Sequence, residues 1–274
     1  MTDTSVRVSR EWLALREPAD AAARSTELVE MVAQSDPGVG RTIVYDLACG
    51  TGSMSRWLAP RLPGRQHWVL YDWDTNLLRH AAAAMPHAAA DGAEITFETR
   101  SRDITRLDPG DLTGASLITA SALLDMLTAD EVGRVVSACV GAACPALLTL
   151  SVVGRVELAP AEPLDHQVAV AFNDHQCRTV GGRHLLGPDA VGFTADEFTR
   201  LGAEVMVRPS PWRLGPGEAR LAAEWFAGWL GAACEQQPEL SGATTTYGNR
   251  RWAEATAGRL GVMVGHDDLL VRPR

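Results

Sequence analysis

The chain has 274 residues, 46% of them hydrophobic, and a formal net charge of −9 at pH 7. This length and hydrophobicity predict one large α/β domain, or one domain with an elaboration. The acidic balance argues against a nucleic-acid partner, because phosphate binding needs a basic face. No run approaches a membrane span, and the first twelve residues lack the apolar core of a signal peptide.

The five cysteines form no CxxC pair and, with the histidines, no metal-ligand spacing. We therefore expect neither a metal site nor a disulfide framework. The odd number and the missing framework favour a reducing, cytoplasmic environment.

Residues 11–35 are predicted to be helical, as one helix or as a pair broken near Pro18, with Leu28, Val29 and Val32 on one face. Two interpretations of Arg24 stay open. It is either part of a solvated helix face or a guanidinium that grips the carboxylate of a ligand. We expect residues 1–40 to form a helical lid.

Residues 42–47 form a short β-branched and apolar run, which is typical of a buried parallel strand. The run contains Asp46 and leads into a tight loop with Gly50 and Gly52. A helix follows at 54–62, strained by Pro60 in its last turn. A strand, a glycine turn and a helix N-terminus together predict a cradle for a nucleotide-sized ligand.

Asp46 separates the two ligand classes that use such a cradle. A carboxylate beside the loop would repel the pyrophosphate of a dinucleotide. It would attract the ammonium and sulfonium of S-adenosylmethionine, which carries no phosphate. Ser55 also departs mildly from the dinucleotide fingerprint. The sequence therefore predicts a methyl-donor site.

Polar residues follow the next predicted strands, at 66–71, 94–99 and 115–120. Asp72 lies twenty positions after Gly52, near the offset at which a carboxylate meets ribose hydroxyls. Asp74 is predicted to cap the helix at 75–85. Asp103 either accepts a hydrogen bond from an exocyclic amine or is a turn residue. Ser121 ends the fourth strand at the edge where open α/β sheets bind ligands.

Capping boxes at 128–131 and 194–197 predict helix starts. A fifth strand is expected at 146–153, a sixth at 204–208 and a last at 261–271, with helices at 221–234 and 249–259. A donor-binding half at 41–153 would precede an insertion at 154–192, with a helix at 165–176 and a hairpin at 178–186. We place acceptor specificity in this insertion. Residues 193–274 would complete a single domain.

Four motifs in order, DLACGTGS, YDWD, RDI and TASALLDML, resemble those of class I S-adenosylmethionine-dependent methyltransferases. The resemblance implies a three-layer Rossmann-like fold, with a seven-stranded, mostly parallel sheet and a reversed last strand. It implies S-adenosylmethionine as cofactor and S-adenosylhomocysteine as product. Besides Arg24, it implies that Asp46, Ala48, Gly50 and Gly52 bind the methionine part of the donor and that Ser121 lies at its amino-acid end. Asp72 would bind the ribose. The adenine would contact Trp73, Asp103 and Ile104.

Methyl transfer is an in-line displacement in which positioning and water exclusion do much of the catalysis. A general base is needed only when the acceptor loses a proton. His175, in the inserted helix, is the preferred candidate, and His175→Ala should then lower turnover far more than donor affinity. Asp125, one helical turn after Ser121, is the second candidate. His166 and His184 are further alternatives.

Eight tryptophans are many for this length and favour a flat or cationic small-molecule acceptor. The family resemblance permits an aromatic or indole-type intermediate of a natural-product pathway. Two alternatives remain: a nicotinamide-dependent oxidoreductase, and a methyltransferase relative that binds the donor without catalysis. The sequence does not indicate an oligomeric state.

Overall fold

The computed structural model describes residues 8–35 and 40–273; residues 1–7 and 36–39 of the expected lid lie outside this range. The described residues form an eight-stranded sheet in the order β3-β2-β1-β4-β5-β10-β8, in which the short β9 also pairs with β10. The strands are β1 Arg41–Leu47, β2 Arg65–Asp72, β3 Ile95–Ser101, β4 Leu117–Ser121, β5 Ala146–Ala159, β8 Glu204–Pro209, β9 Trp212–Leu214 and β10 Gly261–Arg272. Because β10 runs antiparallel to both β5 and β8, the predicted reversed last strand is confirmed.

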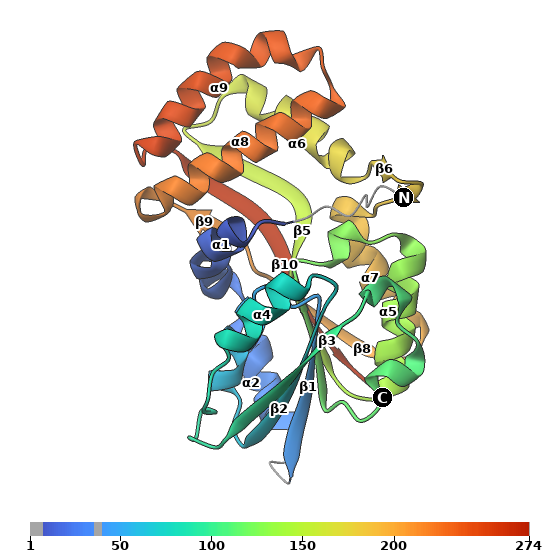
Figure 1. The fold of residues 1–274 in the computed structure, drawn as a ribbon. Coiled ribbons are helices and arrows are strands. Elements are labelled where there is room, and N and C mark those ends of the chain that lie inside the picture. Colours follow the sequence, from blue (N-terminus) through green and yellow to red (C-terminus); the bar gives the residue numbers. More distant parts are fainter. Residues whose placement is uncertain (1–7, 36–39, 274) are drawn as a thin grey trace.

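Helices cover both faces of the sheet (Figure 1). Trp68 and Leu70 of β2 pack with α2, α3 and α4, whereas Val69 and Tyr71, which alternate with them, pack with α5 and α7. This alternation is the two-residue period of a strand buried on both sides. The helices are α1 Arg10–Ala23, α2 Thr26–Ser35, α3 Ser53–Leu58, α4 Thr75–Ala83, α5 Ala129–Ala142, α6 Pro163–Gln176, α7 Ala190–Arg200, α8 Ala219–Gln236 and α9 Leu240–Thr256.

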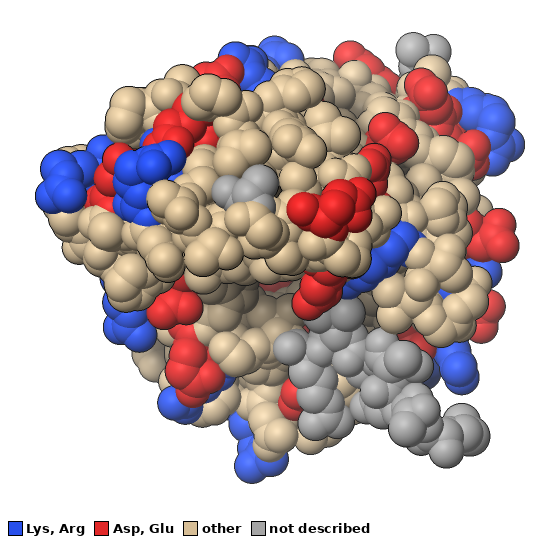
Figure 2. Space-filling model, turned by 90° about the horizontal axis from the view of Figure 1, so that it is seen from above, with Lys and Arg blue, Asp and Glu red and all other residues tan. Residues whose placement is uncertain are grey.

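A helical cap of α6, α8 and α9 lies over one end of the sheet, carried by the extended ends of β5 and β10 (Figure 1). Its core contains tryptophans from α8 and β9. On the face seen from above, basic and acidic side chains are interspersed (Figure 2). Part of the predicted insertion is thus a continuation of β5, followed by α6 and the predicted hairpin, β6 Thr179–Val180 and β7 Arg183–His184.

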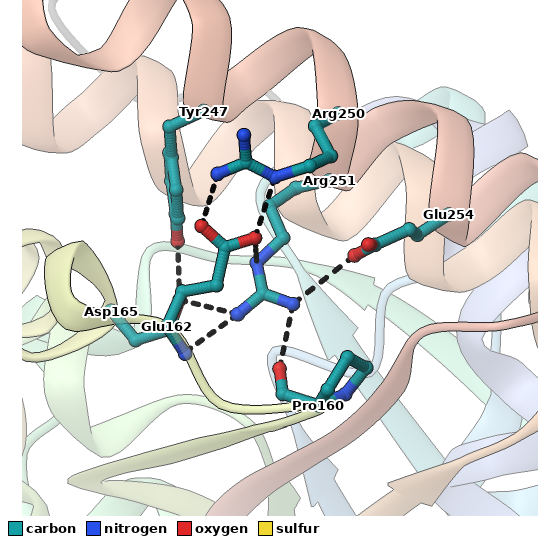
Figure 3. Close-up of polar contacts among 7 residues, drawn as sticks. All are labelled: Pro160, Glu162, Asp165, Tyr247, Arg250, Arg251 and Glu254. Carbon is teal, nitrogen blue, oxygen red and sulfur yellow. Dashed lines mark hydrogen bonds and ion pairs between the residues drawn. The ribbon is translucent and has the colours of Figure 1, made fainter.

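Arg251, on α9, is fully buried and ties α9 to the start of α6 (Figure 3). Its Nη2 donates to both carboxylate oxygens of Asp165, at 2.9 and 2.7 Å. Its Nη1 donates to the Pro160 carbonyl at 2.7 Å and to Glu254 at 3.1 Å. The Tyr247 hydroxyl donates to the same Asp165 at 2.7 Å. A buried cation is tolerated here because acidic groups and a carbonyl surround it.

A bulge marks the point where β5 leaves the parallel sheet. Leu150 has φ of 57°, and the pairing of β5 with β10 shifts register opposite it. Asp268 of β10 is fully buried and accepts hydrogen bonds from the Leu150 amide (2.8 Å), the Ser210 hydroxyl (2.6 Å) and the Ser25 amide (2.7 Å). One carboxylate thus fixes the bulge and the junction of α1 with α2.

Several local predictions need correction. Pro18 lies within α1, in a turn that the Arg16–Asp20 ion pair spans, and the helical break falls instead at Arg24, whose ψ is 138°. The capping box at 194–197 is wrong, since α7 already begins at Ala190 and Thr194 is buried within it. The Asp74 cap and the capping box at 128–131 are confirmed.

Candidate active site

The glycine loop after β1 turns through three residues with positive φ: Ala48 (51°), Gly50 (56°) and Gly52 (83°). A Cβ on Gly52 would lie 3.1 Å from the Cβ of Ala81 in α4 and 3.2 Å from its Cα. Glycine is required there both by its conformation and by this close approach.

Asp72 holds the glycine loop from the end of β2. Its Oδ2 accepts a hydrogen bond from the Gly50 amide and its Oδ1 one from the Asp74 amide, both at 2.8 Å. Burial raises the pKa of Asp72 against the effect of these bonds. A carboxylate has about four lone-pair sites, so Asp72 retains capacity to accept from a ligand hydroxyl.

Asp46 is fully buried at the end of β1, and burial raises its pKa from 3.8 to about 7. Its Oδ1 accepts from the Thr119 hydroxyl at 2.9 Å. Its Oδ2 has no hydrogen-bond partner among the described residues, although the side chain lines the cavity described below. An unpartnered buried carboxylate oxygen calls for a cationic or hydrogen-bond-donating guest.

Arg24 lies behind the site. Its Nη2 donates to the hydroxyls of Ser53 and Ser121, at 3.1 Å each, while within the described chain its Nε and Nη1 have no partner. Ser121 also accepts from the Thr149 hydroxyl at 3.1 Å. With two donors pointing at its oxygen, Ser121 keeps its own hydrogen to donate to a ligand.

A cavity of about 1420 Å³ joins these groups. Of the residues predicted to bind the donor, it is lined by Asp46, Ala48, Gly50, Asp72, Trp73, Asp103, Ile104 and Ser121. Arg24 and Gly52 do not line it, but both contact residues at its wall. Asp103 also caps a short turn by accepting from the Thr105 amide at 3.0 Å, so both of its alternative interpretations remain compatible with the structure.

The two candidate bases lie in different places. Asp125 lines the cavity, and burial raises its pKa. His175 is not among the lining residues. Its Nε2 lies 3.2 Å from a carboxylate oxygen of Glu235 and its Nδ1 3.2 Å from Nη1 of Arg178. Phe172, three positions earlier, is the residue of α6 that lines the cavity. Although three positions bring His175 close to the same side of α6 as Phe172, its ring contacts Glu235 of α8 and does not line the cavity.

The other end of the cavity is lined by residues that the sequence did not single out as a site. They come from α1, α6, α8, β9 and β10, and include Trp12, Arg16, Asp20, Phe172, Trp212, Trp225 and His266. Of these, His266 has a local signal, because it begins a run of three ionisable residues, continued by Asp267 and Asp268, inside a largely apolar strand. The others become neighbours through the fold.

Acidic groups dominate the cavity. Among the described residues, eight carboxylates and four guanidinium groups line it. Arg16 is paired with Asp20, Arg183 with Glu131 and Arg106 with Asp103. The wall is therefore electrostatically suited to a guest that carries positive charge.

Comparisons with known proteins give one sequence match and several structural likenesses. Residues 44–145 match a family model described as a methyltransferase domain. The structure resembles a cyclopropane synthase from Mycobacterium tuberculosis over 96% of this chain and 94% of that one, at 12% identity and a TM-score of 0.50. An S-adenosylmethionine-dependent methyltransferase from Geobacter sulfurreducens, solved with S-adenosylhomocysteine, matches over 98% and 100% of the two chains at 15% identity and a TM-score of 0.45. No curated protein sequence matches the chain.

The likeness to the cyclopropane synthase shows a shared fold. The family match runs from the second half of β1 to just past α5, and therefore includes the glycine loop, Asp72, Asp103 and Ser121. Among the described residues, no helix has the length and apolar character needed to cross a membrane. Residues 44–145 thus match a methyltransferase-domain model, and the chain as a whole shares the fold of the cyclopropane synthase.

Proposed function

We propose that this chain transfers the methyl group of S-adenosylmethionine to a small, flat organic acceptor held beneath α1 and the helical cap. One observation carries the proposal: a single cavity joins the acid-lined glycine loop to an end lined by tryptophans. Its volume of about 1420 Å³ exceeds the roughly 300–1,000 Å³ of a typical single-ligand site, which leaves room for donor and acceptor together.

In this proposal the donor's ammonium meets the unpartnered Oδ2 of Asp46. Its carboxylate receives the hydroxyl hydrogen of Ser121, with the charge of Arg24 behind it. The ribose hydroxyls bind Asp72, and the adenine lies near Trp73, Asp103 and Ile104. The bound donor supplies an electrophilic methyl group on its sulfonium.

The acceptor would lie between aromatic side chains, among them Trp12, Phe172, Trp212 and Trp225. Aromatic rings favour offset or edge-to-face contact with a flat guest. Within this class, aromatic and indole-type intermediates of natural-product pathways suit the lining. Asp125 would take a proton from the acceptor, since its raised pKa brings it closer to the pKa of a useful general base.

Calorimetry with S-adenosylmethionine, S-adenosylhomocysteine and NAD tests the donor site. We expect the first two to bind and NAD not to bind, because the dinucleotide would place its pyrophosphate beside Asp46 and Asp72. A panel of hydroxylated and amino-substituted aromatics, with formation of S-adenosylhomocysteine as the readout, tests catalysis. Binding without turnover on any member would favour a non-catalytic relative, and NAD binding alone would favour an oxidoreductase.

Asp125→Asn should lower turnover on the best panel substrate by roughly 100-fold, the low end of what general-base catalysis contributes. The affinity for S-adenosylhomocysteine should stay within about twofold. Wild-type turnover should rise with pH as Asp125 ionises, and this rise should vanish in the variant. His175→Ala is the matched control: in contrast to the expectation from sequence, we expect it to leave turnover unchanged. A loss confined to the His175 variant would reverse the assignment.

A further inference from the structure

His266 of β10 is buried and lines the tryptophan-lined end of the cavity. Its Nδ1 lies 3.0 Å from the carbonyl oxygen of Val264. A carbonyl only accepts hydrogen bonds, so Nδ1 carries the proton and Nε2 keeps a lone pair. Within the described part of the chain, Nε2 has no hydrogen-bond partner. The imidazole therefore offers one acceptor atom whose partner has to come from outside the protein.

The ring is held in place from several sides. It packs against the Trp212 ring, with 5.3 Å between centroids. The Trp212 indole Nε1 in turn donates to Asp20 at 3.0 Å, and the Arg16 guanidinium lies 4.8 Å from the Trp212 ring centroid. The register of β10 against β5 also shifts between Val264 and His266. A residue fixed in this way can orient a bound molecule.

The charges around this end of the cavity identify what it accepts. Arg16 is already gripped by Asp20, through Nε–Oδ2 at 3.0 Å and Nη2–Oδ1 at 3.1 Å. Burial, with Arg16 nearby, lowers the pKa of His266 to about 3, so the imidazole is neutral at physiological pH. Asp125, whose pKa Arg16 also influences, accepts hydrogen bonds when ionised. A carboxylate or phosphate on the acceptor would find no free cation among these described groups.

Building on the proposed function, we infer that His266 is a specificity-determining residue for the methyl acceptor. Its Nε2 accepts a hydrogen bond from a hydroxyl or N–H group carried on a flat aromatic frame. This chemistry selects phenols, hydroxylated polycycles and N–H heteroaromatics. It disfavours the same frames when the hydrogen has been replaced by an alkyl group.

The test compares 1-naphthol with 1-methoxynaphthalene, which share one frame and differ in the hydrogen-bond donor. Both are titrated by calorimetry into full-length protein saturated with S-adenosylhomocysteine. The wild type should bind 1-naphthol about tenfold more tightly, the upper end expected for a neutral hydrogen bond. His266→Phe keeps a ring against Trp212 and should reduce the ratio of the two dissociation constants to about one. His266→Gln restores an acceptor atom and should recover most of the preference.

Three results would overturn the inference: no preference in the wild type, a preference that persists in the phenylalanine variant, or no binding of either probe. S-adenosylhomocysteine affinity, measured first in each variant, should stay within about twofold. If the wild type does not bind S-adenosylhomocysteine, the proposed function itself is wrong. A second measurement needs no variant: long-range ¹H–¹⁵N correlation should show His266 protonated only on Nδ1 from pH 5 to 8. An Nε2–H tautomer, or titration in this range, would contradict the assignment.

Discussion

Asp46→Asn should weaken S-adenosylmethionine binding by roughly 10- to 100-fold, the effect of losing a hydrogen bond to a charged partner. The same substitution should stabilise the ligand-free protein at pH 8. The pKa of Asp46 rises from 3.8 to about 7 because the carboxylate is buried. A raised carboxyl pKa means that the folded state binds the proton more tightly than the unfolded chain does. Stability is therefore lost as pH rises from about 4 to about 7.

Asparagine does not ionise, so the variant avoids this loss in the free energy of unfolding. We place the loss at roughly 2–4 kcal/mol above pH 7. Chemical denaturation should show the gain at pH 8 and little of it at pH 4. Donor affinity of the wild type should fall about tenfold from pH 7.5 to pH 6, as Asp46 takes up a proton, and the variant should lack this dependence. Asp196→Asn, at an exposed position of α7, is the control for removing one charge. Unchanged donor affinity in the Asp46 variant would refute the role given to this carboxylate.

Arg251→Met should lower the free energy of unfolding by about 3–5 kcal/mol. Methionine fills part of the volume, but Asp165 loses its bidentate partner and the Pro160 carbonyl loses a donor. The loss is large because Arg251 is fully buried, so water does not replace these bonds. Urea denaturation gives the difference directly. The affinity for S-adenosylhomocysteine should change little in the folded variant, since the glycine loop lies outside this cluster.

The adjacent Arg250 provides the matched control. It pairs with Glu162 in the same cluster, but about half of its side chain is exposed (49%). Arg250→Met should therefore destabilise by less than about 1 kcal/mol, as is usual for ion pairs that water can replace. If both variants lost the same free energy of unfolding, burial would not be what makes the Arg251 contacts more stabilising than those of Arg250.

The donor half was predictable because its signals are local. A β-branched run, a glycine turn and acidic residues after successive strands occupy short windows, and the parallel sheet brings their ends to one edge. The strand order and the reversed last strand follow from the family resemblance. Asp74 as a helix cap needed only a four-residue pattern.

The acceptor half was less predictable because its contacts are long-range. The Arg251 cluster joins segments some 86 residues apart. His175 and Phe172 differ by three positions and share nearly one side of α6, yet Phe172 lines the cavity while His175 contacts Glu235 of α8, a partner 60 residues away in the sequence. β5 was expected to end at residue 153, because Gly154 resembles a strand terminus, whereas the strand bends at Leu150 and continues to Ala159. His266 is one of three consecutive ionisable residues in β10, and its neighbours Trp212 and Arg16 come from distant elements.

β5 and β10 pass without a break from the parallel sheet into the helical cap, and Asp268 fastens the point at which they bend. The cap is consequently not a detachable module. A chimera that imports α6, α8 and α9 from a relative, while keeping both strands and Asp268, would exchange substrate preference on an intact scaffold. A graft with its crossover at residue 154 would instead interrupt the β5–β10 pairing, which supports both the sheet below the cavity and the helical cap above it.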